Sequence, residues 1–155
     1  MTFKEQLTEM DACPDAIKWV GGKTLEQAWA ECERGEWMLW FAQQKGVDLQ
    51  TLTLAKARCA KLVIHLMKDE RSRNAVDVAE RFGLGQATRE ELDEARRAAS
   101  AYASNAVDYA ASAAYASTDT TDAAYAASAA AVASDARSET LQKCADICRE
   151  VITIC

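Results

Sequence analysis

Signals that begin and end helices recur along this chain, and a single proline, Pro14, stands among them. The stretches "TFKE", "TLEQ" and "TREE", which begin at Thr2, Thr24 and Thr88, each place an acidic or amide side chain three residues after a threonine. This spacing is that of a capping box, in which the two side chains bind backbone N–H groups at the start of a helix. The sequence lacks the period-2 alternation of β-branched and polar residues that indicates strands, so it predicts an all-α protein.

The same signals predict where the helices lie. The first helix should follow Thr2, and Asp11 can cap a second helix, which carries Pro14 in its first turn and stops at Gly21. Further helices are expected at about 24–33, 36–45, 48–67, 70–82, 88–116 and 121–151, with Gly35 as a break and Gly46 and Gly83 as stops.

Residues 95–136 contain 20 alanines, and tyrosines are the only aromatic residues there. Alanine has the highest helix propensity, and its small side chain lets two helices approach closely. We therefore expect the helices at 88–116 and 121–151 to form a long antiparallel hairpin, joined by "STDTTD" at 117–122. A disordered linker is the alternative, but the tract lacks the glycine and proline that favour disorder.

The length of 155 residues is that of one domain, and it allows a sizeable core to be buried. Alanine contributes little area on burial, so the larger side chains must form most of that core. Tryptophans and leucines gather in residues 1–85, which predicts a helical core there. Residues 86–155 are then expected to pack on this core as the Ala-rich hairpin, so that the chain forms a single domain and a compact helical bundle.

The chain carries 18 basic and 24 acidic side chains, which gives a net charge of −6. Nucleic-acid binders are usually basic, so this balance predicts no direct nucleic-acid partner and favours a protein partner with a basic surface. The first residues lack the basic start and apolar run of a signal peptide, and no apolar stretch is long enough to span a membrane. Six cysteines without a secretion signal fit a reducing compartment, so we expect a cytoplasmic protein without membrane contact.

Each cysteine falls on an apolar stripe with helical spacing, which predicts packing in the core. The six are Cys13, Cys32, Cys59, Cys144, Cys148 and Cys155. Metal binding or redox chemistry is the alternative, because Cys144 and Cys148 lie four residues apart on one predicted helix, and a disulfide is a further one. The single histidine, His65, is expected in the last turn of its helix and turned away from Cys59. We therefore predict no catalytic pair, no metal and no cofactor.

The motifs that usually indicate an enzyme do not occur in this sequence. It contains no phosphate-binding loop, no dinucleotide-binding glycine pattern and no nucleophile elbow. Paired carboxylates could act as acid and base only in a pocket that separates their pKa values. Glu31, Glu33 and Glu36 instead flank a glycine, where we expect solvent to reach them. The sequence therefore predicts no catalytic residues.

Four tryptophans lie within the first 40 residues, and each can bury a large apolar area. The simplest interpretation is that all four belong to the core. The alternative is a protein-binding surface, since an aromatic centre with a charged rim is typical of binding hot spots. Trp37 and Trp40 share one face of a predicted helix. The candidate protein-binding residues are Asp11, Asp15, Glu33, Glu36, Trp37 and Trp40.

Several stretches together resemble an Ala-rich family of immunity proteins from bacteria and their phages, similar to immunity protein five. They are "DACPDAIKWVGGKTLEQAWAECERGEWMLWFA", "RCAKLVIHL" and a later tract with "AYAS" and "AAYAAS" steps. The likeness covers nearly the whole chain, and its most specific part lies around "RGEWMLW". The resemblance implies an all-helical fold and a protein that neutralises a toxin by direct binding, and it supplies no catalytic residues.

The residues and the resemblance together predict a non-enzymatic inhibitor. It would neutralise a toxin, a nuclease or a host-defence effector by direct stoichiometric binding, as an anti-CRISPR protein does. Its acidic ends would steer it toward a basic patch before the aromatic side chains are buried. Two alternatives stay open. One is a structural or assembly protein that self-associates, for example as a homodimer, through the Ala/Tyr hairpin. The other is a metal or small-molecule binder that uses the C-terminal cysteines.

Overall fold

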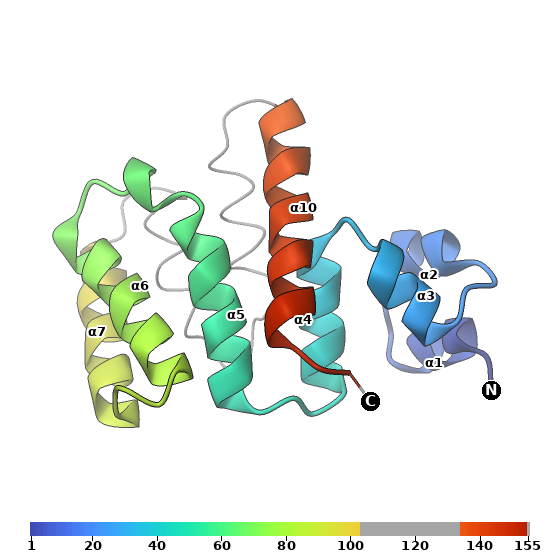
Figure 1. Ribbon diagram of the computed structural model, residues 1–155, viewed down its shortest axis with the longest axis horizontal. Helices are drawn as coiled ribbons and strands as arrows, with labels where there is room; N and C mark the ends of the chain where they lie inside the picture. Colours follow the sequence, from blue (N-terminus) through green and yellow to red (C-terminus); the bar gives the residue numbers. More distant parts are fainter. Residues whose placement is uncertain (103–133, 155) are drawn as a thin grey trace. The chain divides into compact units, whose positions relative to one another are not determined.

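The computed structural model of the chain describes residues 1–102 and 134–154 (Figure 1). These residues belong to two compact units, residues 1–32 and residues 33–155, which we describe separately. All regular secondary structure in the described part is helical, as the capping boxes and the helical periodicity predict. The all-α class is therefore confirmed.

The first unit contains three short helices, α1 (Phe3–Glu9), α2 (Pro14–Val20) and α3 (Leu25–Glu31). Two of them begin with the predicted capping boxes. The backbone N–H of Thr2 donates to Glu5 Oε2 at 2.6 Å, and the N–H of Glu5 donates to Thr2 Oγ1 at 3.3 Å. Thr24 and Gln27 exchange the same two bonds, at 3.0 and 3.3 Å, so the start of α3 is also confirmed.

Asp11 does not cap α2, and that prediction is wrong. Asp11 has φ of 56° and is the left-handed residue that ends α1. The N–H of Asp11 donates to the carbonyl of Thr8 at 3.1 Å, and the N–H of Ala12 donates to that of Leu7 at 3.0 Å, which is a Schellman motif. Aspartate tolerates this conformation better than most residues. Cys13 takes the cap position of α2 instead, without a side-chain hydrogen bond.

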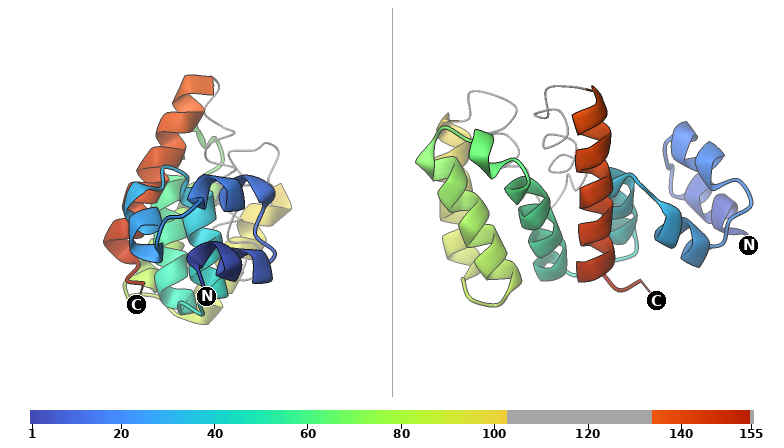
Figure 2. Two further views of the ribbon diagram at one scale, coloured as in Figure 1. Left: turned by 90° about the vertical axis from the view of Figure 1, so that its right-hand side faces the viewer. Right: turned by 45° about the horizontal axis from the view of Figure 1, so that its top comes forward.

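The second unit is built around α5 (Leu49–Lys61), which lies between two pairs of helices (Figure 1, Figure 2). On one side it packs against α4 (Gly35–Gln44) and α10 (Ser134–Val151), which also pack on each other. On the other side it packs against α6 (Glu70–Gly83), and α6 packs in turn on α7 (Arg89–Tyr102). A short 3₁₀ turn, η1 (Ile64–Leu66), follows α5, so the helix predicted to reach residue 67 ends six residues earlier.

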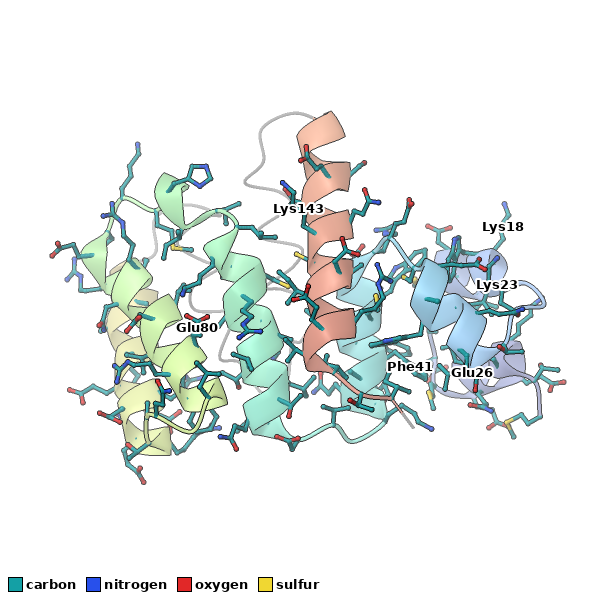
Figure 3. All side chains as sticks on the ribbon, viewed as in Figure 1. Lys18, Lys23, Glu26, Phe41, Glu80 and Lys143 are labelled. Carbon is teal, nitrogen blue, oxygen red and sulfur yellow. The ribbon has the colours of Figure 1, made fainter. Side chains whose placement is uncertain are left out.

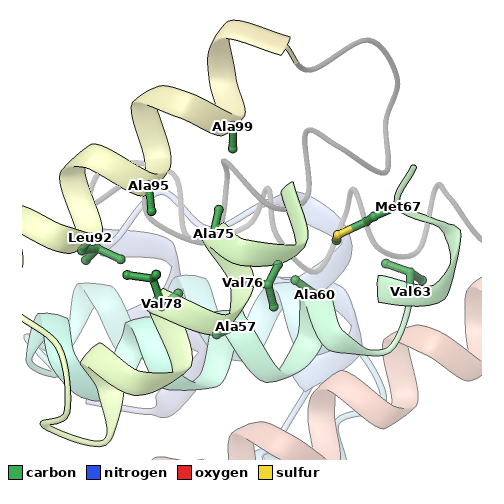
Figure 4. Packing of buried hydrophobic residues seen from close by; sticks show 11 residues of the cluster. Ala57, Ala60, Val63, Met67, Ala75, Val76, Val78, Leu92, Ala95 and Ala99 are labelled. Carbon is green, nitrogen blue, oxygen red and sulfur yellow. The ribbon is translucent and has the colours of Figure 1, made fainter. Parts of the chain in front are cut away.

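Small side chains dominate the core between α5, α6 and α7 (Figure 4). This core consists of Ala57, Ala60, Val63, Met67, Ala75, Val76, Val78, Ala79, Leu92, Ala95 and Ala99. Ion pairs fasten the edge of the same contact. The carboxylate of Glu80 on α6, labelled in Figure 3, forms ion pairs with Lys61 and Arg58, which both lie on α5. Arg58 Nε lies 3.7 Å from Glu80 Oε1.

The predicted antiparallel hairpin is not confirmed. The described part of its first helix, α7, packs on α6, whereas the described part of its second helix, α10, packs on α4 and α5. The predicted turn at 117–122 lies outside the described residues. The division into two units at residues 32 and 33 also differs from the predicted boundary between residues 85 and 86, because α6 and α7 pack together across that boundary.

Two glycines allow the helices of the second unit to approach closely. A Cβ on Gly35 would lie 2.8 Å from the carbonyl carbon of Cys144 and 2.9 Å from the backbone nitrogen of Ala145. A Cβ on Gly83 would lie 2.8 Å from Cα of Leu54. Gly35 was predicted to break the preceding helix, but that helix ends at Glu31 and Gly35 is the buried first residue of α4. Its role is close packing against α10.

Candidate protein-binding surface

Helix α4 carries two half-buried tryptophans that point away from the side packed on α10. Gly35 and Met38 face α10, since Cys148 Sγ donates to the carbonyl of Gly35 at 3.9 Å and Arg149 Nη1 approaches Met38 Sδ at 3.8 Å. At 100° per residue, Trp37 lies about 200° and Trp40 about 140° around the helix from Gly35. Both indoles are half-buried. We call Trp37 and Trp40 the tryptophan face of α4.

An arginine that the sequence analysis did not single out holds this face in shape. Arg34 Nε and Nη2 both lie close to Glu36 Oε1, at 2.6 and 2.5 Å. The guanidinium carbon is also 4.4 Å from the centre of the Trp37 ring, which is a cation–π contact. The carboxylate therefore fixes the cation over the indole. The sequence does place an arginine three residues before a tryptophan at a helix start, which is a spacing that allows a cation–π contact. The spacing does not show which carboxylate holds the arginine.

Glu36 was expected to be solvated and to form part of a charged rim, and this expectation is wrong. Its exposed fraction is only 5%, and its second oxygen, Oε2, is buried without a hydrogen-bond partner. Gly35 and Glu36, the first two residues of α4, are both buried, so the helix begins inside the protein and its second residue does not reach solvent. Glu36 acts on the surface through Arg34 and cannot itself supply a rim charge.

The other acidic candidates are exposed. Glu33 is the first residue of the second unit and precedes α4, so it lies on the same segment as the tryptophan face. Asp11 and Asp15 are exposed in the first unit, at the end of α1 and in the first turn of α2. The structure thus brings Glu33, Trp37 and Trp40 together on one short stretch of chain, and it places the two aspartates in a separate compact unit.

The remaining two tryptophans, Trp19 and Trp29, are also half-buried, so none of the four sits in the centre of a core. In the first unit, Lys23 Nζ lies 5.0 Å from the centre of the Trp19 ring and 3.7 Å from Glu31 Oε2. The interpretation of the tryptophans as core residues therefore holds only for part of each ring.

Four of the described cysteines are buried, as predicted: Cys32, Cys59, Cys144 and Cys148. Cys13 is exposed, which corrects its assignment to the core, because its extended backbone precedes the first turn of α2. Hydrogen bonds with the thiols of Cys144 and Cys148, together with burial, raise the pKa of Cys59 well above its ordinary value. In residues 1–102 and 134–154, no three side chains of His, Cys, Asp or Glu have a geometry that could hold a metal ion. Cys155 lies outside the described residues.

His65 is exposed in η1 and not in a helix end, since α5 stops at Lys61. A second feature that the sequence analysis did not find is Lys56, whose side chain is fully buried on α5. A lysine side chain is usually expected to reach solvent with its charged end, so no local signal predicts this burial.

The fold and the site define an all-helical chain with a tryptophan face on one of its helices. Comparison of this chain with protein-family models, with curated proteins and with solved structures found no match. The resemblance to immunity proteins therefore stays a prediction from the sequence. Among the helices that the structure describes, none combines the length and the hydropathy that crossing a membrane requires.

Proposed function

We propose that this chain is a non-enzymatic protein inhibitor, which neutralises a toxin, a nuclease or a host-defence effector by direct stoichiometric binding. The tryptophan face of α4 would form the centre of the contact, and Arg34 would present the indole of Trp37 in a fixed orientation. Glu33, which precedes α4 in the same unit, would act as an acidic group beside this contact, and Asp11 and Asp15 in the first unit would add negative charge that attracts a basic partner.

The observation that carries this proposal is the half-buried pair Trp37 and Trp40 on the side of α4 turned away from α10. Tryptophan and arginine are enriched among the few residues that supply most of the binding energy in protein interfaces. An indole fixed beforehand by a cation–π contact loses little conformational freedom on binding. These features favour a binding surface for a protein.

The charge of the chain favours a basic partner. The net charge is −6, and Asp11, Asp15 and Glu33 are all exposed. Exposed charges of this kind act mainly on the association rate and on its salt dependence. Neutralising the three carboxylates should therefore slow association at low salt and leave the dissociation rate nearly unchanged.

The experiment compares affinity capture by the immobilised chain with capture by the double variant Trp37→Ala/Trp40→Ala. The double variant Trp19→Ala/Trp29→Ala is the matched control, because its two indoles are also half-buried but lie in the first unit. A captured toxin or nuclease is then assayed against increasing amounts of the chain. We expect activity to reach zero at one molecule of inhibitor per effector, and the α4 variant to weaken binding about 100-fold.

Two results would argue against the proposal. In the first, the α4 variant binds the captured effector as tightly as the unchanged chain while its circular dichroism shows the same helix content. In the second, the captured effector keeps its full activity when the chain is in excess.

The alternative is a structural or assembly protein that self-associates through the Ala/Tyr hairpin at 88–151. It rests on the composition of residues 95–136, which include 20 alanines. Small side chains of this kind allow helices of two copies to approach closely. Light scattering distinguishes the two proposals, because self-association predicts a dimer or larger species at high concentration and the inhibitor alone predicts a monomer.

A further inference from the structure

Three thiols from two helices meet in the core of the second unit. Cys59 belongs to α5, whereas Cys144 and Cys148 belong to α10, and all three side chains have an exposed fraction of 0%. Helix α10 packs against α5, and side-chain hydrogen bonding by Cys144 and Cys148 raises the pKa of the Cys59 thiol. We call these residues the thiol cluster. Its members are 85 or more residues apart across the two helices, so only the fold brings them together.

The close approach of α10 explains why the thiols are in contact. Cys144 and Cys148 lie four residues apart on α10 and therefore project from the same face of that helix. Gly35 has no side chain between α4 and α10, and Cys148 Sγ comes within 3.9 Å of its carbonyl oxygen. This packing sets α10 deep between α4 and α5, with both of its thiols beside Cys59.

We propose that the thiol cluster is a redox-sensitive latch: oxidation joins Cys59 to Cys144 or Cys148 by a disulfide and ties α10 covalently to α5. The contact between the thiols makes the required displacement small. A disulfide also needs its two Cα atoms within about 7 Å of each other, which closely packed helices can provide.

The oxidant is a small-molecule disulfide. The thiolate of one cysteine attacks a sulfur of the reagent, the reagent's S–S bond breaks, and one reagent thiolate leaves. The second cysteine thiolate then attacks the protein sulfur of the mixed disulfide and expels the second reagent thiolate. The two protons lost by the cysteines end on the two released thiols, so two cysteines are oxidised and one reagent disulfide is reduced.

Burial sets the rate of this reaction. Thiols with no exposed surface are out of reach of a reagent, so the first attack requires α10 to move away from α5. The disulfide therefore forms at the rate at which α10 moves away from α5. Once formed, it prevents that movement. The third thiol of the cluster can attack the new disulfide, so the bond can exchange between Cys144 and Cys148.

The test uses the full chain with Cys13→Ser and Cys155→Ser, which removes the exposed thiol and the one outside the described residues. Oxidised glutathione is added, and the intact mass and the disulfide-linked peptides are measured. We expect the loss of two hydrogen atoms and a linked peptide that contains Cys59 with Cys144 or Cys148. The midpoint of thermal unfolding should rise by about 10 °C, because the new bond closes a loop of more than 80 residues.

Two further variants in the same background locate the bond. Cys59→Ala should abolish the linked species, whereas Cys32→Ala, the matched control with a buried thiol in the first unit, should keep it. The peptide map decides the question even where Cys59→Ala does not fold. Glutathione adducts without an internal bond, or linked peptides that lack Cys59, would overturn the proposal.

Discussion

At the scale of single residues, the contact between Arg34 and Glu36 shows how burial changes the role of a charge. The Glu36 side chain has an exposed fraction of 6% and the Arg34 side chain one of 41%, so the carboxylate depends on the arginine while the arginine can still reach water. Removing the two partners should therefore have unequal effects on stability.

We expect Arg34→Ala to lower the free energy of unfolding by about 2 kcal/mol, because it leaves a buried carboxylate without its cation. The double variant Arg34→Ala/Glu36→Gln should regain most of this loss, since no buried charge remains. Urea unfolding measures both. Lys143→Ala breaks the exposed pair with Glu139 and should change stability by less than about 0.5 kcal/mol. Equal losses in the single and double Arg34 variants would contradict the argument.

Gly35 is the second residue whose role depends on its surroundings. We expect Gly35→Ala to destabilise the chain by about 1–3 kcal/mol, because the added methyl group would meet the backbone of Cys144 and Ala145. Gly22→Ala is the control, as no atom lies within 4 Å of a Cβ at that position. The midpoint of thermal unfolding compares the two. A Gly35→Ala chain as stable as the unchanged one would show that α10 can move outward without loss.

At the scale of elements, one residue at the start of α6, Asp69, both caps the helix and forms an ion pair. Asp69 accepts the N–H of Arg71 at 2.8 Å and receives the guanidinium of Arg71 at 2.9 and 2.8 Å. These bonds, first those of the side chain, lower the pKa of Asp69 from 3.8 to about 2. The ionised carboxylate is thus favoured in the folded state.

This shift predicts a defined dependence of stability on pH. A folded pKa below the unfolded value means that the contribution of Asp69 is complete above pH 3.8 and is lost as the pH falls toward 2. Asp69→Asn should remove this part of the dependence. The free energy of unfolding, measured from pH 5 to pH 2 for both chains, provides the test. Parallel curves would show that Asp69 does not contribute.

The helix boundaries show which features a sequence predicts well. The capping boxes at Thr2, Thr24 and Thr88 all form, since each needs only residues three positions apart. The end of α5 is predicted six residues too late, because the apolar stripe continues through Val63 and Met67 after the helix has stopped. Those two side chains still reach the core from the positions that flank the 3₁₀ turn, so periodicity alone does not reveal the break.

At the scale of the whole molecule, the two compact units differ in size. We expect residues 33–155 alone to unfold cooperatively, because α4, α5, α6, α7 and α10 pack on one another within that unit. A peptide of residues 1–32 should be largely unfolded alone, since a chain below about 40 residues rarely buries enough surface. Circular dichroism during heating tests both. A non-cooperative transition in residues 33–155 would contradict the division.

The candidate site was predictable only in part. The pairing of Trp37 with Trp40 on one face follows from helical spacing, and both are half-buried. The sequence did not reveal Arg34, and it assigned Glu36 to the surface, because the burial of the first turn of α4 is set by tertiary packing. The residues in contact at that point, Gly35 and Cys148, are 113 positions apart.

The sequence by itself determined the helical class of this protein, the starts of the three helices that begin with capping boxes and the burial of most of its cysteines. These features depend on hydrogen bonds and periodicities within a few residues, which any part of the chain carries on its own. Only the tertiary structure decided that α10 packs between α4 and α5, that Glu36 lies inside, and that three thiols meet. Contacts of that kind depend on which faces of distant helices fit together, and local sequence does not encode that choice.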